Sequence, residues 1–332
     1  MTLAGVPAWW LAAHLAAGVV GTWLARRYAL HRALIDHPGD RRSHAMPTPR
    51  GGGVGIVAAL LLALAWLAWT TPPARTLLTL TGAGLALVAG IGWADDHRPL
   101  PASLRLLVHA VAAALLGAGL MVHGAPPWLA VCTAVLALVL VNVWNFMDGI
   151  DGLAASQGAL VALGYALWAS GGVAGWLAAA VMAGLLGFLP FNLPRARVFL
   201  GDVGSGAIGF ALACVVGITW RQLPEASRAM LLLPLAAFGV DAALTLLSRI
   251  LNKERWWEAH VTHAYQRWAQ REGHVVVTVA YGAWTLVGVV LMLHLPGWSW
   301  GSAMASGVYL AAGVGIWWKL RGKGVQALGV GK

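Results

Sequence analysis

The sequence predicts an all-α protein that crosses a lipid bilayer many times, and two observations predict this fold class. Of the 332 residues, 59% are hydrophobic and only 10% are charged, with a mean hydropathy of +0.73. Soluble globular domains rarely have such a composition. The apolar residues also gather in runs of about 20, the length that a membrane-spanning helix needs.

Eleven apolar segments are predicted to span the membrane as helices. The sixth and seventh are separated only by a Ser-Gly-Gly sequence. The stretches follow one another too closely for separate soluble domains, so we expect one polytopic domain over residues 1–332. The predicted spans are 8–25, 52–71, 76–94, 103–122, 128–144, 157–172, 174–191, 205–220, 229–250, 275–295 and 301–318.

The distribution of positive charge predicts the orientation of these spans. If the N-terminus is periplasmic, 19 of the 22 Lys and Arg residues lie in cytoplasmic segments. That asymmetry follows the positive-inside rule for inner-membrane proteins. It predicts a cytoplasmic C-terminus, and it accounts for the net charge of +10 without a nucleic-acid partner.

Most acidic residues lie in short polar gaps on the predicted cytoplasmic side. Asp95 and Asp96 share one gap, Asp148 and Asp151 the next, and Asp202 a third. Carboxylates beside hydrocarbon are costly, so their presence there indicates function. Convergent carboxylates suit a divalent cation and a phosphate-bearing substrate. We therefore expect an enzyme with its active site on the cytoplasmic loops.

The first cytoplasmic loop is basic and leads into a run of three glycines. Arg41, His44 and Arg50 precede Gly51–Gly53 and the second span. Exposed backbone N–H groups at a helix N-terminus can hold phosphate. The alternative is a positive-inside anchor whose glycines allow close helix packing.

Two further gaps present carboxylates beside helix ends. Asp95 and Asp96 close the third span, and as adjacent like charges they need water, a cation or a base to stabilise them; a helix cap or solvated loop is the alternative. Asp202 lies in a Gly-rich turn before the eighth span. There a carboxylate can ligate Mg²⁺ while backbone amides approach phosphate oxygens.

The motif NVWNFMDGIDGLAAS at 142–156 carries polar side chains at helical spacing. Asn142, Asn145 and Asp148 are three apart and share a helix face if the helix continues. The two glycines of the motif predict a break that places Asp148 and Asp151 on a turn.

The last cytoplasmic loop, 254–274, contains His260 and His263, with Arg267 one turn further on. Zinc is disfavoured because HExxH spacing and a third ligand are lacking. The loop instead predicts a basic, amphipathic helix at the membrane surface that binds an anionic headgroup or pyrophosphate.

Taken in order, these motifs resemble those of the polyprenyl-phosphate N-acetylhexosamine-1-phosphate transferases, the bacterial glycosyltransferase 4 family. The resemblance extends over residues 36–267, and the form HVTHAYQR is closest to the O-antigen and lipopolysaccharide-initiating branch. The matching motifs are DHPGDRRSHAMPTPRGGG, WADDHRPLPASLR, NVWNFMDGIDGLAA, VFLGDVGS, FGVDAALTLLSRI and EAHVTHAYQR.

The resemblance implies roles for individual residues. Mg²⁺, with Mn²⁺ as the alternative, would bind Asp202, and Asp95 and Asp96 would serve the cation or the lipid phosphate. Asp241 matches an aspartate at a span end whose role is open. The implied catalytic residues are Asp95, Asp96, Asp148, Asp151, His260 and His263, and the substrate-binding residues are Arg41, His44, Arg50, Asn142, Asn145, Asn192, Phe199 and Arg267.

The implied reaction transfers a sugar 1-phosphate from a UDP-N-acetylhexosamine to undecaprenyl phosphate in the bacterial inner membrane and releases UMP. The expected donor is UDP-N-acetylglucosamine or a 6-deoxy sugar such as UDP-N-acetylfucosamine, and a homodimer is left open. One alternative is phospho-N-acetylmuramoyl-pentapeptide transfer. Transport of a lipid or nucleotide sugar is disfavoured, because no repeat is visible and the acids lie at the membrane edge rather than the midplane.

Overall fold

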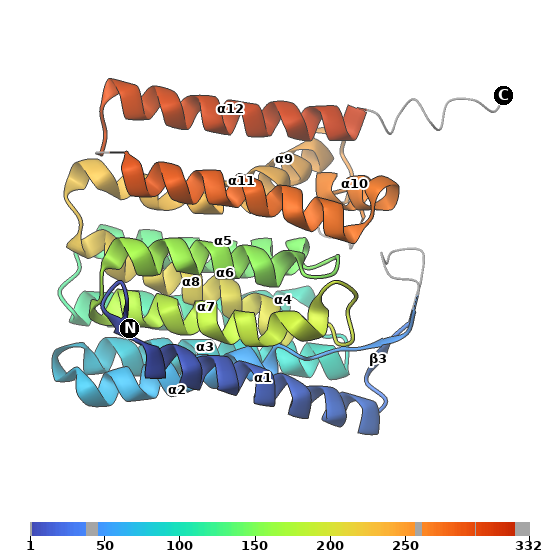
Figure 1. Cartoon of the computed structure of the whole chain (residues 1–332), viewed down its shortest axis with the longest axis horizontal. Coiled ribbons are helices and arrows are strands. Elements are labelled where there is room, and N and C mark those ends of the chain that lie inside the picture. The colour runs from blue at the N-terminus through green and yellow to red at the C-terminus, as the bar shows by residue number, and fades with distance from the viewer. Residues whose placement is uncertain (1, 38–45, 256–260, 296, 323–332) are drawn as a thin grey trace.

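A computed structural model describes residues 2–37, 46–255, 261–295 and 297–322, and it confirms an all-α membrane protein (Figure 1). Two short antiparallel ribbons, β1–β2 and β3–β4, accompany the helices. The helices are α1 (Ala8–His31), α2 (Val54–Thr70), α3 (Arg75–His97), α4 (Ala102–Val122), α5 (Pro127–Met147), α6 (Leu153–Ala169), α7 (Gly172–Asn192), α8 (Asp202–Gln222), α9 (Ala236–Leu251), α10 (Ala264–Glu272), α11 (His274–His294) and α12 (Trp300–Gly322). The strands are β1 (Thr2–Leu3), β2 (Val6–Pro7), β3 (Ile35–Asp36) and β4 (Thr48–Pro49), and the 3₁₀ segments are η1 (Pro72–Ala74) and η2 (Glu225–Leu235).

Each of the eleven predicted spans overlaps one of the long helices. Within the described residues, eight helical segments are long and apolar enough to cross a membrane. The helices α2 and α6 are apolar but have only 17 residues each. The helix α12 has 23 residues and is rich in Gly, Ser and Trp. The prediction of a multi-pass bundle is therefore confirmed.

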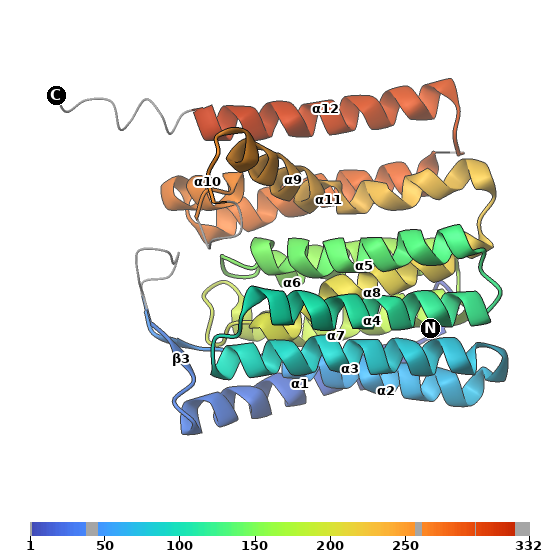
Figure 2. The ribbon, with the colours of Figure 1, turned by 180° about the vertical axis from the view of Figure 1, so that it is seen from behind.

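Helix α8 forms the centre of the bundle, and it lies among the other helices in both ribbon views (Figures 1 and 2). Every residue from 203 to 219 is buried. Small residues allow this close packing: a Cβ added to Gly209 would lie 2.2 Å from the carbonyl oxygen of Leu140 in α5. Close backbone approach through small residues is how helices associate in membranes.

The ninth predicted span differs from expectation, because it is not one straight helix. Residues 225–235 form η2, and α9 follows it at an angle to its neighbours (Figure 2). Pro234 lies inside η2, where its ring and missing N–H disfavour a continuous α-helix. The predicted amphipathic helix of 254–274 is also shorter than expected, since α10 begins only at Ala264.

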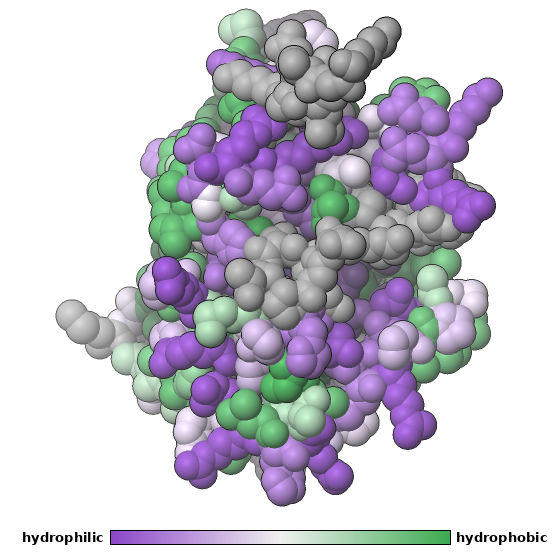
Figure 3. All heavy atoms as spheres, turned by 90° about the vertical axis from the view of Figure 1, so that its right-hand side faces the viewer, coloured by the Kyte–Doolittle hydropathy of each residue, from purple (hydrophilic) through white to green (hydrophobic). Residues whose placement is uncertain are grey.

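The two ends of the bundle differ in character. Helix α1 begins at one end of the bundle and α12 ends at the other, as an odd number of crossings requires (Figure 1). The end that carries α10 and the β3–β4 ribbon is largely hydrophilic (Figure 3). Large apolar side chains such as Leu62, Val131 and Val279, each more than 60% exposed, lie along the helices, where lipid would surround them. That the hydrophilic end is cytoplasmic stays a prediction.

Candidate active site

Two of the predicted carboxylates meet at one arginine at the hydrophilic end of the bundle. Nη1 of Arg105, in the first turn of α4, donates to Oδ2 of Asp95 at 2.9 Å and to Oδ2 of Asp202 at 3.0 Å. Asp95 also accepts the backbone N–H of Leu100 at 2.6 Å. Helices α3, α4 and α8 thus bring Asp95 and Asp202 to the same nitrogen of one guanidinium.

The neighbouring carboxylate, Asp96, faces the start of α8. It is 4% exposed and accepts the backbone N–H groups of Asp202 at 3.1 Å and Val203 at 3.3 Å. These N–H groups have no acceptor within their own helix, so Asp96 caps α8 from another helix and complements its positive dipole end. The adjacent acids therefore differ: Asp95 pairs with Arg105, and Asp96 fixes Asp202.

Glycines allow α3, α8 and the Gly-rich loop to approach so closely. A Cβ on Gly92 would lie 2.5 Å from the carbonyl carbon of Asp202, and one on Gly53 would lie 2.3 Å from the Cα of Gly204. Gly52 and Gly53 donate their N–H groups to the carbonyls of residues 199 and 200 at 2.8 Å. Arg50 directly precedes these glycines and donates its N–H to the carbonyl of Leu34 at 3.2 Å, and its role toward substrate stays a prediction.

The motif of residues 142–156 ends beside the same carboxylates. Helix α5 stops at Met147, which confirms the predicted break, and Asp148 follows at its C-terminus. Asn145 donates to Oγ of Ser205 in α8 at 3.3 Å, while Asn142 donates to the carbonyl of Leu138 in its own helix. Burial and neighbouring negative charges, chiefly that of Asp202, raise the pKa of Asp148 well above its usual range. A cationic ligand would favour its ionised form.

Other predicted site residues hold neighbouring loops together. Oδ2 of Asp151 lies 3.2 Å from Nδ1 of His274 at the start of α11. Asn192, which is 4% exposed, accepts the N–H of Gly152 at 2.7 Å and donates to the carbonyl of Val198 at 3.0 Å. Phe199 donates its N–H to the carbonyl of residue 49 at 2.8 Å. These contacts tie neighbouring loops together, and the roles of the three residues toward substrate stay predictions.

The open question of Asp241 is answered by a buried network. Asp241 is 1% exposed and accepts the N–H groups of Ala264 and Tyr265, both at 3.0 Å, and the Tyr281 hydroxyl at 2.7 Å. The Nδ1 of His263 lies 3.5 Å from its Oδ1. Asp241 thus caps α10 from α9, as Asp96 caps α8 from α3.

The same network joins the last loop to the carboxylate cluster. The Tyr265 hydroxyl donates to the carbonyl of Phe146 at 2.9 Å, two residues before Asp148. The His263 ring packs against the ring of Phe146. His263 precedes α10 and is 3% exposed, whereas Arg267 lies within α10 and contacts the end of α12. His263 is the N-cap residue of α10, and its carbonyl accepts the N–H of Arg267, one turn further on, at 3.2 Å.

We expect Asp241→Asn to lower the free energy of unfolding by about 2–3 kcal/mol, because an amide nitrogen would replace one acceptor oxygen facing buried donors. Tyr281→Phe, which removes one donor and keeps the carboxylate, should cost about 1 kcal/mol. Thermal unfolding of both variants in one detergent checks the order. Equal melting temperatures for Asp241→Asn and the wild type would contradict the capping role.

The sequence-based site lacked Arg105. The signal was available, because Arg105 is the sole Lys or Arg in the predicted span 103–122, and an ionisable residue within a span indicates function. Three predicted residues, Arg41, His44 and His260, lie outside the described part of the chain.

The donor groups suit a magnesium ion only in combination with a substrate. Among the described residues, no three His, Cys, Asp or Glu side chains are grouped as a complete metal site. Mg²⁺ commonly takes one or two carboxylates together with substrate phosphates and water. This mode fits one oxygen of Asp95 and one of Asp202, which accept from the same guanidinium nitrogen of Arg105. Asp96 fits it less well, because both of its oxygens already accept N–H groups of α8.

Fold and site together define an integral membrane protein with an acid-rich centre at one end of its bundle. Residues 77–220, from α3 to α8, match the model of glycosyl transferase family 4. This range includes five predicted site aspartates: Asp95, Asp96, Asp148, Asp151 and Asp202. The loop before α2 and the loop after α9 lie outside it.

Known relatives point to the same family. The decaprenyl-phosphate N-acetylglucosaminephosphotransferase of Mycobacterium tuberculosis is 34% identical over 57% of this chain. The match spans about half (54%) of the length of that protein. The probable undecaprenyl-phosphate N-acetylglucosaminyl 1-phosphate transferase of Bacillus subtilis is 29% identical over 74% of this chain and 72% of its own. The phospho-N-acetylmuramoyl-pentapeptide-transferase of Heliobacterium modesticaldum is 32% identical over 62% of this chain and 72% of its own length. The chain belongs to glycosyl transferase family 4, the polyprenyl-phosphate N-acetylhexosamine-1-phosphate transferases.

Proposed function

We propose that this protein transfers N-acetylhexosamine 1-phosphate from a UDP-sugar to undecaprenyl phosphate at the cytoplasmic face of a bacterial inner membrane. The main support is a cluster at one end of the bundle, which we call the carboxylate cluster, where Arg105 binds the carboxylates of Asp95 and Asp202. Relatives whose names specify polyprenyl-phosphate acceptors support it. We propose the first membrane step of O-antigen or related cell-envelope polysaccharide synthesis as its role.

The proposed reaction exchanges one phosphoanhydride for another. An oxygen of the lipid phosphate attacks the β-phosphorus of the UDP-sugar, and the bond from that phosphorus to the bridging oxygen breaks. The products are UMP and a polyprenyl-pyrophosphoryl sugar, so the free energy change is small and no ATP is needed. The main barrier is the approach of two anions, which positive charge and fixed orientation reduce.

The residues of the cluster divide this work. Arg105 offers positive charge between Asp95 and Asp202, where the two phosphates would meet. Asp202 and Asp95 would hold Mg²⁺, which supplies further positive charge to the phosphate oxygens when bound. Asp96 fixes the start of α8, so it acts as a positioning residue.

Asp95 need not act as a base. Its two oxygens already accept hydrogen bonds from the Leu100 N–H and Arg105. A phosphate monoester is also largely ionised near neutral pH, because its second pKa is about 6. Asp95 therefore orients the acceptor or the cation in this proposal.

The test is incubation of purified protein with undecaprenyl phosphate, Mg²⁺ and a panel of labelled UDP-N-acetylhexosamines. We expect label in the butanol-extractable lipid and one UMP per lipid product. UDP-N-acetylglucosamine is the first donor to try, because two relatives are named for that sugar, and UDP-N-acetylfucosamine is the second. Release of UDP in place of UMP would exclude sugar 1-phosphate transfer.

The donor panel also tests the nearest alternative. A relative named for phospho-N-acetylmuramoyl-pentapeptide transfer is 32% identical to this chain, so UDP-N-acetylmuramoyl-pentapeptide belongs in the panel. Label transferred from that donor alone would move the proposal to peptidoglycan synthesis. If no donor gives label in the lipid, the result would favour transport of a lipid or nucleotide sugar.

A further inference from the structure

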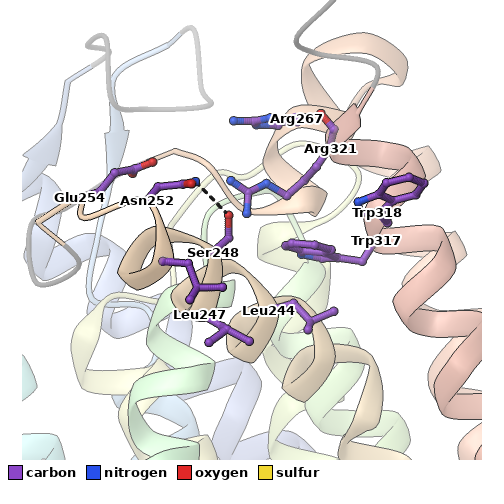
Figure 4. A pocket seen from close by; sticks show the side chains of 10 residues that line it. Leu244, Leu247, Ser248, Asn252, Glu254, Arg267, Trp317, Trp318 and Arg321 are labelled. Carbon is purple, nitrogen blue, oxygen red and sulfur yellow. Dashed lines mark hydrogen bonds between the residues drawn. The ribbon is translucent and has the colours of Figure 1, made fainter.

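A second polar feature lies away from the carboxylate cluster, in a pocket between α9, α10 and α12 (Figure 4). Its apolar wall consists of Leu244, Leu247 and Leu251 from α9 and two tryptophans, Trp317 and Trp318, from α12. Leu251 is 71% and Trp318 is 75% exposed. Exposed leucine beside tryptophan is typical of the boundary between the hydrocarbon core and the lipid headgroups.

Two arginines form the other wall of the pocket. Arg267 comes from α10 and Arg321 from the last turn of α12, and Figure 4 shows both above Leu244 and Leu247. Glu254 also borders the pocket, but its Oε2 lies 2.8 Å from Nη1 of Arg249, so its charge is already paired. The charge that faces the pocket is therefore positive.

The Arg321 guanidinium lacks a full set of acceptors. It lies over the Trp317 ring, with its central carbon 4.9 Å from the ring centroid. Within the described residues, its buried Nη1 has no hydrogen-bond partner. An unpaired buried donor is unfavourable, and a phosphate oxygen is a strong acceptor for a guanidinium.

We propose that this pocket binds an anionic phospholipid of the surrounding bilayer, with its phosphate at Arg267 and Arg321. The acyl chains would lie along Leu247 and Leu251, which face outward from α9. This combination of apolar wall, aromatic residues and paired cations matches an amphipathic anion and not a free nucleotide. The lipid would join α9, α10 and α12, whose mutual contacts border the pocket.

The pocket is distinct from the catalytic cluster in the elements that build it. The cluster comes from α3, α4 and α8, and none of these contributes a residue to the pocket. We place the phospholipid phosphate here and the reacting phosphates at the cluster, which assigns Arg267 to the pocket in place of its implied role toward the substrate. The inference does not rest on that reaction, since binding can be measured without a sugar donor.

The experiment is native mass spectrometry of the full chain, released from detergent with equimolar phosphatidylglycerol and phosphatidylcholine. Each arginine near a membrane surface contributes about five-fold to binding of an anionic lipid, so two predict a preference for phosphatidylglycerol of roughly 25-fold. Arg321→Gln should lower this preference to about five-fold. Lys319→Gln is the matched control, because Lys319 is exposed on the same helical turn and does not border the pocket.

A second variant pair guards against loss of folding in Arg321→Gln. Ser248 borders the pocket from α9, so Ser248→Asp places a negative charge beside the phosphate, whereas Ser248→Asn does not. Of these two Ser248 variants, we expect only Ser248→Asp to lose the preference for phosphatidylglycerol. Equal losses in Arg321→Gln and Lys319→Gln would show diffuse surface charge and overturn the site. Displacement of phosphatidylglycerol by equimolar undecaprenyl phosphate would assign the pocket to the polyprenyl lipid and overturn the phospholipid assignment.

Discussion

Asp202→Asn is expected to lower kcat by about 1,000-fold. The amide keeps the size of the side chain and the backbone N–H that Asp96 accepts. It removes the negative charge beside Arg105, and with it one of the two carboxylates suited to a cation. Initial rates of UMP release at saturating donor and acceptor check this prediction.

Two companion variants make that result specific. Glu225→Gln lies at the opposite end of the bundle, in η2, and should leave the rate unchanged. Asp95→Asn tests whether Asp95 takes a proton: near-normal turnover from about pH 6 to pH 9, on either side of the phosphate pKa, would exclude a base there. A full rate for Asp202→Asn would remove Asp202 from the catalytic centre.

Gly92→Ala is expected to disrupt the site although it adds only a methyl group outside it. The new Cβ would lie 2.5 Å from the carbonyl carbon and oxygen of Asp202, both backbone atoms. Helices α3 and α8 must therefore separate, at a cost of about 1–3 kcal/mol. Displacement of a reacting group by about 1 Å can cost 100-fold in rate. Unfolding temperature and kcat should both fall.

Gly90→Ala supplies the matched control on the same helix. A Cβ at Gly90 meets no atom within 4 Å, and alanine favours a helix over glycine by up to about 1 kcal/mol. Stability and rate should hold or rise. If Gly92→Ala behaved like Gly90→Ala, the close approach of α3 and α8 would not be what aligns Asp202.

The bundle was predictable from the sequence because hydrophobic runs are a direct signal of membrane helices. The break after Met147 and the separation of α6 from α7 followed from glycines at the expected positions. The division of the ninth span was harder, because Pro234 lies in an apolar run whose length alone favours one helix. Hydropathy reports burial in lipid and says little about helix geometry.

The division of labour within the site was not predictable, because it depends on contacts between distant segments. In the sequence, Asp95 and Asp96 are indistinguishable neighbours. In the structure, Asp95 faces Arg105, whereas Asp96 faces the start of α8. Asp241 likewise shows its role only once α10 is in place. Sequence spacing identified the acids, and tertiary packing decides which of them cap helices.

The cap that Asp96 places on α8 sets an order for the protein's biosynthesis. The N–H group that Asp96 accepts lies 106 residues further along the chain. At about 5–20 residues per second, the ribosome needs roughly 5–20 s to deliver it. During that interval the Asp96 carboxylate lacks the α8 N–H groups that it accepts in the folded protein. The nascent chain can assemble a working centre only after α8 has been inserted. An inhibitor or chaperone that acts before then would encounter a chain whose Asp96 and Asp202 are not yet in contact.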